Sequence, residues 1–271
     1  MKTLHDHVIL YDDQCPLCRQ YTGAFVSCDM LDKNGRAAFN TLDRSTLPGV
    51  DWEKARNEIA LVNRKSGEVI YGVASLTTIL GNSFPWFKPV FAKRWFQLAV
   101  SKLYMFISYN RKVIAPGNIF EQPGACTPDL NYTYRWLYIL FAAVATTLII
   151  GAYARLMPSL QSLLDYKTEF LVIAAQLLVQ GSVVWAIRRE RTIHYLGNLM
   201  TILLLCALAL TPAFALSVFI RSEYFFFSYL MLAVGFMFYE HWRRSRILGL
   251  PIEVTFTLFI YKVAATCVVL L

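Results

Sequence analysis

The pattern of apolar and polar positions divides this chain into two halves of different character. Up to about residue 130, short apolar runs alternate with polar breaks, as in a soluble domain of strands and helices. From residue 136 onward, apolar stretches approach the roughly 20 residues that a membrane-spanning helix requires. We therefore predict a soluble domain over 1–114, a linker rich in proline and glycine over 115–135, and a transmembrane helical domain over 136–271.

The first half predicts an α/β domain with the element order β-α-β-α-β-β-α. Strands are expected at His7–Tyr11, Arg36–Leu42, Ile59–Asn63 and Val69–Tyr71, and helices at Cys15–Leu31, Trp52–Asn57 and Ser75–Leu80. The short polar segment Lys65–Glu68 separates the last two strands, so these strands are expected to form an antiparallel hairpin.

The segment Phe84–Lys112 is dense in aromatic and basic residues and predicts an amphipathic helix from about residue 90. Its apolar stripe consists of Val90, Phe91, Trp95, Leu98, Ala99, Leu103, Phe106 and Ile107. We expect this stripe to pack against the sheet. In the alternative arrangement it lies in a membrane interface, with Trp86, Lys88 and Arg94 in contact with lipid headgroups.

The second half predicts an all-α bundle of five transmembrane helices, with four as the alternative because the last stretch contains Pro251, Glu253 and Lys262. The expected spans are Trp136–Ala154, Phe170–Ile187, Tyr195–Ile220, Tyr224–Tyr239 and Ile247–Leu271. Gln176, Gln180 and Lys262 are polar candidates for function within these spans. The alternative roles are hydrogen bonding between helices for the glutamines, and snorkelling or pairing for the lysine.

Composition and charge support a membrane protein. Hydrophobic residues make up 56% of the chain and charged residues only 16%, against about 25% charged in soluble proteins. Basic clusters lie at Arg188–Arg191 and Arg243–Arg246, and Arg111-Lys112 precedes the first span. The positive-inside rule then places the soluble domain in the cytoplasm, on a bacterial-type inner membrane. The net charge of +8 follows predicted lipid boundaries, so the lipid bilayer is an expected partner and nucleic acid is not.

The chemistry-bearing motif is Cys15-x-x-Cys18, which directly follows the first strand and opens the first helix. Unpaired amides at a helix start favour a thiolate, so Cys15 is expected to attack and Cys18 to resolve the mixed disulfide. Arg19 adds positive charge, whereas Asp12 and Asp13 oppose the thiolate. One of the two aspartates, with Asp12 the candidate, is expected to accept a proton from Cys18 during resolution.

The remaining cysteines do not complete a metal site. A structural zinc site needs four ligands, usually with a second closely spaced pair. Cys28, Cys126, Cys206 and Cys267 form no such pair, so no metal is expected. Cys28 is interpreted as a buried apolar residue of the first helix, and Cys206 and Cys267 as apolar residues of the spans. Cys126, in the linker, is either a third redox thiol or a structural residue.

The element order resembles the thioredoxin-like core of glutaredoxins, and Tyr11-Asp12-x-x-Cys15-x-x-Cys18 resembles the signature of the DCC family of thiol-disulfide oxidoreductases. The resemblance covers about residues 6–128. Tyr104 and the pair Asn110-Arg111 look like features near the end of that family's domain, and Ala125–Pro128 looks like its terminal element.

Two features depart from the families that the chain resembles. Asp13 stands where the DCC pattern usually has glycine. No proline precedes Ile59, whereas thioredoxins place a cis-proline before the corresponding strand. A substrate thiol is therefore expected to be held differently from a thioredoxin substrate.

The resemblance and the motif together imply a membrane-anchored enzyme that reduces or exchanges disulfides on a protein or a small molecule. A cytoplasmic dithiol rests reduced, which favours a reductase over an oxidase. No cofactor beyond the dithiol is expected. The alternatives are a binding or sensing module attached to a transporter-like bundle, and a quinone-linked bundle that exchanges electrons with the dithiol.

Overall fold

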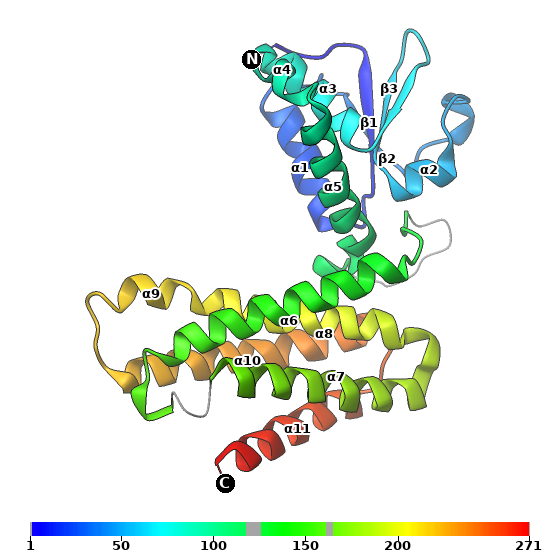
Figure 1. Ribbon diagram of the computed structural model, residues 1–271. Coiled ribbons are helices and arrows are strands. Elements are labelled where there is room, and N and C mark those ends of the chain that lie inside the picture. Colours follow the sequence, from blue (N-terminus) through cyan, green and yellow to red (C-terminus); the bar gives the residue numbers. More distant parts are fainter. Residues whose placement is uncertain (1, 118–125, 161–164, 271) are drawn as a thin grey trace. The chain divides into compact units, whose positions relative to one another are not determined.

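The computed structural model describes residues 2–117, 126–160 and 165–270, with the side chains of these residues except Leu160, Val269 and Leu270. Part of the predicted linker, including Ala125, and the end of the predicted last span, Leu271, lie outside the described residues. The chain forms two compact units, Met1–Tyr134 and Arg135–Leu271. Figure 1 shows the elements of each unit.

The N-terminal unit has a small mixed sheet with helices on both faces (Figure 1). Its strands are β1 (His7–Tyr11), β2 (Arg36–Ala38), β3 (Ala60–Asn63) and β4 (Val69–Tyr71). Its α-helices are α1 (Pro16–Ser27), α2 (Trp52–Asn57), α3 (Val73–Ser83), α4 (Lys88–Phe91) and α5 (Arg94–Ile114), and η1 (Arg44–Thr46) and η2 (Pro85–Phe87) are 3-10 turns.

The strand order is β2-β1-β3-β4. β1 pairs in parallel with β2 and antiparallel with β3, and β3 and β4 form the predicted antiparallel hairpin. The parallel pair requires a crossover, which α1 supplies. This small mixed sheet with helices fits a thioredoxin-like domain, as the element order predicted.

Alternation along the central strand β1 creates two cores. Val8 and Leu10 point to one face, where they pack with Phe39, Val50 and Ala55 beneath α2. Ile9 points to the opposite face, which is covered by side chains of α1, α3 and α5. The described core residues of this second face are Ile9, Leu31, Ile59, Leu61 and Ile79, with Tyr21, Phe25, Leu76 and Tyr104 packed against them. All three residues at the centre of β1 are at most 3% exposed, which fixes the strand that leads into the motif.

Helix α5 packs through a different face from the one predicted. The Tyr104 hydroxyl accepts a hydrogen bond from the Ile59 amide at 2.8 Å, and the Ser108 hydroxyl donates to the Asn57 carbonyl at 2.6 Å. The polar face of α5 therefore packs against the domain, because its hydroxyl groups form hydrogen bonds with the backbone just before β3. Trp95, Leu98 and Leu103 of the predicted packing stripe are 63%, 56% and 57% exposed, so that expectation was wrong for them.

A second local prediction was also wrong. Cys28 is exposed rather than buried. The helix α1 ends at Ser27, and Cys28 is the residue that caps it. The prediction of burial assumed that the helix continues through Cys28. Because the helix ends one residue earlier, its buried face does not include Cys28.

The C-terminal unit is helical throughout its described elements. Its helices are α6 (Tyr132–Ala154), which begins in the N-terminal unit, α7 (Tyr166–Arg188), α8 (Thr192–Leu210), α9 (Pro212–Leu216), α10 (Glu223–Ile247) and α11 (Glu253–Leu270), with 3-10 turns η3 (Pro158–Leu160) and η4 (Arg189–Arg191). By length and composition, two described stretches could cross a membrane, Tyr132–Ala154 and Tyr166–Leu216.

The number of spans stays a prediction. The stretch Tyr166–Leu216 contains α7 and α8, which correspond to the second and third predicted spans. The fourth and fifth predicted spans correspond to α10 and α11, which do not meet the same criterion within the described residues. α10 carries glutamates near both ends of its apolar part, and α11 contains Lys262.

Polar side chains join the helices of the C-terminal unit. The Tyr195 hydroxyl lies 2.8 Å from Gln180 Oε1 and 2.9 Å from His241 Nε2, and His241 Nδ1 lies 3.0 Å from Thr255 Oγ1. Gln180 thus accepts a hydrogen bond from another helix, as expected if its role is to join the helices. Gln176 is fully buried, and both polar atoms of its amide lack a hydrogen-bond partner among the described residues.

Candidate active site

The two motif cysteines lie at the start of α1, immediately after β1. Cys15 is the residue that caps the helix, and its sulfur accepts a hydrogen bond from the Cys18 amide at 3.5 Å. Pro16 occupies the first helical position, where its missing N–H costs nothing and its fixed φ suits the helix. Both thiols are free and buried, with Cys15 0% and Cys18 7% exposed.

The surroundings separate the acidities of the two thiols. A hydrogen bond from the Cys18 side chain, with help from the Cys18 amide and Arg111, lowers the pKa of Cys15 to about 7, against the opposing effects of burial and Asp12. The same hydrogen bond, together with burial and the neighbouring Cys15 charge, raises the pKa of Cys18. Above about pH 7 the pair therefore carries a thiolate on Cys15 while Cys18 keeps its proton, which is the distribution that disulfide exchange requires.

A buried ion cluster lies beside the dithiol. Asp12, 2% exposed, is 2.9 Å from Lys112 Nζ, and the Arg111 Nε atom is 3.7 Å from the same carboxylate oxygen, Oδ2. The other oxygen of Asp12 accepts from the Gln14 amide at 3.0 Å, which holds the loop before Cys15. Arg111 and Lys112 are buried on α5, so they are not free basic residues ahead of the first span, as the orientation argument had assumed.

Arg111 connects this cluster to Cys126. Its Nη2 atom donates to the Cys126 carbonyl at 2.8 Å and lies 3.4 Å from the Cys126 sulfur. Burial raises the pKa of Cys126 to about 12, although Arg111 and Lys112 act in the opposite direction. Cys126 is therefore a protonated thiol at neutral pH, and its backbone is tied to the site by the Asn40 side chain, which accepts from the Cys126 amide at 3.1 Å.

Residues 9–115 match the family model described as DCC1-like thiol-disulfide oxidoreductase. The match covers less than half of the chain, and we call the matched part, residues 9–115, the DCC1-like domain. The match confirms the resemblance that the motif suggested, and it supports a thiol-disulfide oxidoreductase. No curated protein and no solved structure gives a significant match to the chain.

The N-terminal unit brings together four of the residues singled out in the sequence, Asp12, Cys15, Cys18 and Cys126. Asp13 instead accepts a hydrogen bond from the Asn40 side chain at the edge of the site. Arg19 is exposed on α1, and the positive charge that lowers the pKa of Cys15 comes from Arg111. Gln176, Gln180 and Lys262 belong to the C-terminal unit.

Sequence reasoning assigned no role in the site to Arg111, Lys112 or Asn40. A signal for Arg111 was present, because Tyr104, Ser108 and Arg111 recur at helical spacing on α5. This polar stripe lies opposite the predicted apolar stripe of α5. It is the face of the helix that packs against the rest of the domain. Among the residues that the structure describes, no cluster of three His, Cys, Asp or Glu side chains could hold a metal ion.

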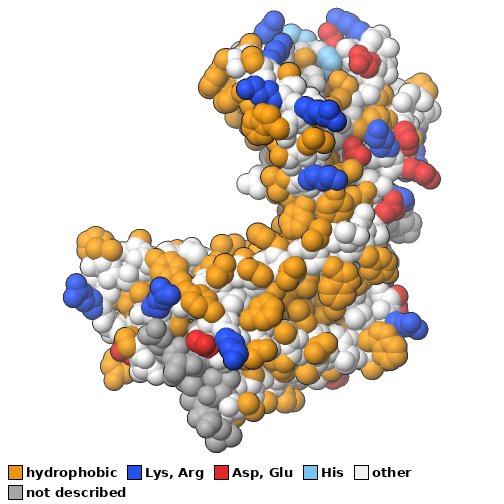
Figure 2. Space-filling model, viewed as in Figure 1, with side chains coloured by type: hydrophobic (Ala, Val, Ile, Leu, Met, Phe, Trp, Pro, Cys, Tyr) orange, Lys and Arg blue, Asp and Glu red, His pale blue; other side chains and the backbone are white. Residues whose placement is uncertain are grey.

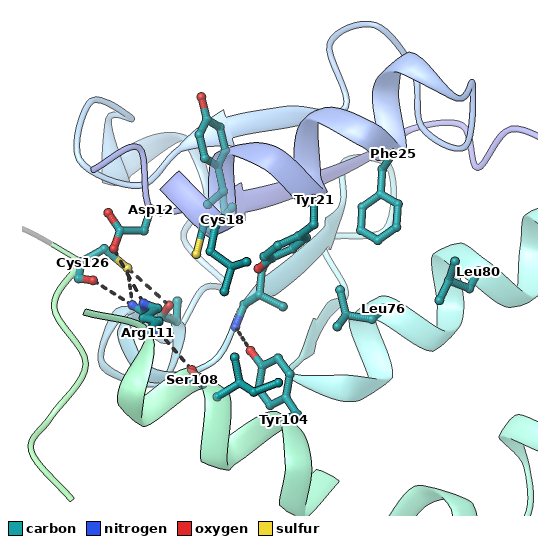
Figure 3. Close-up of a pocket in the computed structure, with 16 residues that line it drawn as sticks. Asp12, Cys18, Tyr21, Phe25, Leu76, Leu80, Tyr104, Ser108, Arg111 and Cys126 are labelled. Atoms are coloured by element: carbon teal, nitrogen blue, oxygen red, sulfur yellow. Dashed lines mark hydrogen bonds and ion pairs between the residues drawn. The ribbon is translucent and has the colours of Figure 1, made fainter. Parts of the chain in front are cut away.

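A cavity of about 330 Å³ opens beside the site of the DCC1-like domain. Figure 3 shows Asp12, Cys18, Arg111 and Cys126 at one end, and Phe25, Leu76 and Leu80 toward the other. Its remaining lining residues are Leu10, Tyr11, Leu17, Tyr21, Ala55, Ile59, Tyr104, Ile107 and Ser108. Cys18 lines this cavity, and Cys15 is not among the lining residues.

The absorbance of the thiolate near 240 nm should titrate with a midpoint near pH 7, because the pKa of Cys15 is lowered to about 7. The thiolate is present above this pH and protonated below it. Asp12→Asn should move the midpoint lower still, since the Asp12 charge raises the pKa of Cys15. Cys15→Ser is the control and should lose the transition. A wild-type midpoint near that of an ordinary thiol would contradict the assignment.

Proposed function

We propose that the DCC1-like domain is a thiol-disulfide reductase that uses Cys15 and Cys18 on a protein or small-molecule disulfide. The observation that supports this proposal is the Cys15 sulfur at the cap of α1, held by the amide and the side chain of Cys18. The family match supports the same reaction class. No cofactor beyond the dithiol enters the reaction.

The reaction proceeds in two steps. The Cys15 thiolate attacks one sulfur of the substrate disulfide, which forms a mixed disulfide and releases one substrate thiol after protonation. Cys18 then loses its proton and attacks Cys15, which releases the second substrate thiol and leaves a Cys15–Cys18 disulfide. The substrate gains two electrons and two protons, and the dithiol loses them. A thiol reductant must restore the dithiol.

Asp12 is proposed to accept the proton from Cys18 in the second step. It lines the same cavity as Cys18 and influences the pKa of Cys18 through its charge. Its ion pair with Lys112 keeps the carboxylate in place beside the dithiol. Proton transfer by a positioned group typically accelerates a step by about 100-fold or more.

Trapping tests these roles. Cys28 and Cys267 are exposed, so both are first replaced by serine. In this background Cys18→Ser should accumulate a mixed disulfide on Cys15, seen by mass spectrometry and reversed by dithiothreitol, whereas Cys15→Ser should not. With both cysteines present, Asp12→Asn should slow the second step by about 100-fold without slowing the first. Absence of any adduct would support the alternative of a binding or sensing module.

We also propose that α6–α11 anchor this domain to a bacterial-type inner membrane through five spans, with the domain in the cytoplasm. Two apolar stretches long enough to cross a bilayer support membrane association. The basic clusters at Arg188–Arg191 and Arg243–Arg246 support the orientation. An odd number of spans then places the C-terminus outside.

Labelling of intact cells tests this topology. Cys28 is exposed on the DCC1-like domain, and in a Cys267→Ser variant a membrane-impermeant maleimide should label it only after permeabilisation. An epitope tag after Leu271 should be reached by antibody without permeabilisation, because of the odd number of spans. A hidden tag would favour four spans, and labelling of Cys28 in intact cells would overturn the orientation.

A further inference from the structure

The cavity beside Cys18 is apolar at its far end and polar at the end next to the dithiol. Side chains from α1, α3 and α5 form the walls, and those nearest the far end, Phe25, Leu76 and Leu80, are apolar (Figure 3). The near end carries the Cys18 thiol, the carboxylate of Asp12 and the guanidinium of Arg111. Apolar walls with a few convergent polar groups are the usual composition of a small-molecule site.

The size and the access of the cavity also suit a small molecule. Its volume of about 330 Å³ is at the lower end of ligand pockets, which span about 300–1,000 Å³. Ile107, which lines it, is 37% exposed, so the cavity reaches the surface. The Cys18 amide donates a hydrogen bond to the Cys15 sulfur at 3.5 Å, so a disulfide that reaches Cys18 lies close to Cys15 as well.

We propose that this cavity is the substrate site of the reductase and that it selects small apolar disulfides, whose organic group lies between α1, α3 and α5. The proposal rests on the dithiol chemistry given above and names its substrate class. The bound disulfide accepts two electrons and two protons from Cys15 and Cys18 and leaves as two thiols. The fully buried Cys15 is then reached through the cavity rather than from the open surface.

Two probes test the selection. Dibenzyl disulfide is apolar and 2-hydroxyethyl disulfide is polar, and the single-turnover rate constant of each is measured with the reduced full-length protein. Leu80→Trp places an indole in the apolar end, away from the cysteines, and should lower the rate constant for dibenzyl disulfide about tenfold. The rate constant for the polar disulfide, which also reaches Cys15 through the cavity, should fall less than that for dibenzyl disulfide, because its hydroxyethyl groups gain little from the apolar end. The matched control is Leu98→Trp, since Leu98 is exposed on α5.

A binding measurement separates this proposal from the proposed reaction. Dibenzyl sulfide has one sulfur and cannot exchange, and it should bind the wild type and a Cys15→Ser/Cys18→Ser variant equally, but not Leu80→Trp. Exchange with both disulfides but no sulfide binding would overturn the cavity proposal and leave the reductase intact. Sulfide binding without any exchange would remove the reductase and, with it, the substrate class.

The outward surface of α5 carries a second, independent inference. Trp95, Leu98 and Leu103 on α5, and Trp86 in η2, are more than half exposed. Lys88, Lys93, Arg94 and Lys102 are exposed around them. Figure 2 shows hydrophobic side chains interspersed with basic ones over this part of the unit. We name these eight residues the α5 surface.

The α5 surface has the composition of a helix at a lipid interface. No aspartate or glutamate occurs between Glu68 and Glu121, so its basic residues face no acidic neighbour from their own segment. Tryptophans, leucines and lysines on one helix bind membranes through apolar insertion and attraction to anionic headgroups. The same chain continues into Tyr132–Ala154, which is long and apolar enough to cross a bilayer.

We propose that the α5 surface lies in the headgroup region of an anionic bilayer. The full-length protein is placed in phosphatidylglycerol nanodiscs, with all six natural cysteines replaced by serine and one environment-sensitive fluorophore added. At Leu98→Cys the emission should shift to the blue, and lipids brominated in the acyl chain should quench it at least twofold. The control is Gln20→Cys, at an exposed position of α1, which should show neither effect.

A double variant tests how much the basic residues contribute to the contact with anionic lipid. Lys93→Gln with Arg94→Gln should reduce quenching at position 98, because attraction to anionic lipid is lost, and helix content by circular dichroism shows that the fold persists. A blue shift at position 98 without quenching would mean that protein covers the α5 surface, either a second copy or the rest of this chain. That result, or an unshifted emission, would overturn the proposal.

Discussion

Asp12, Arg111 and Lys112 place one negative and two positive side chains inside the DCC1-like domain, next to the dithiol. A buried charge is costly unless it is paired, and this cluster by itself leaves one positive charge without a counterpart. A thiolate on Cys15 supplies that counterpart. The electrostatic requirement of the cluster and the chemical requirement of the reaction therefore point to the same protonation state.

The cluster also explains the orientation of α5. Arg111 and Lys112 can reach Asp12 only if the helix turns the face of Tyr104 and Ser108 toward the sheet, where these residues also satisfy the backbone of Asn57 and Ile59. Buried backbone groups without partners are costly, so the polar contacts outweigh the apolar stripe on the other side. The exposed Trp95 and Leu98 follow from this choice.

The elements of the sheet and the location of the dithiol could be predicted because they depend on local pattern. His7–Tyr11, Trp52–Asn57 and Val69–Tyr71 were predicted with the bounds that the structure gives. Which face of α5 packs could not be predicted from periodicity, because both faces show helical spacing and the deciding partner, the Ile59 amide, is far away in sequence. For the same reason Arg111 and Lys112 were interpreted as membrane-boundary charges.

Because Arg111 and Lys112 are buried, the proposed orientation in the membrane is supported by the two later basic clusters, Arg188–Arg191 and Arg243–Arg246. Arg243 and Arg244 both pair with Glu240, at 2.7 and 2.8 Å, so this single carboxylate offsets part of the positive charge of the second cluster in the folded unit. The positive-inside rule nevertheless counts lysines and arginines at the ends of spans, and acidic residues contribute little to it. Pairing with Glu240 therefore leaves the topological signal of this cluster in place. Burial of Arg111 and Lys112 inside a separately folded domain makes them part of the redox site, whichever side of a membrane it occupies.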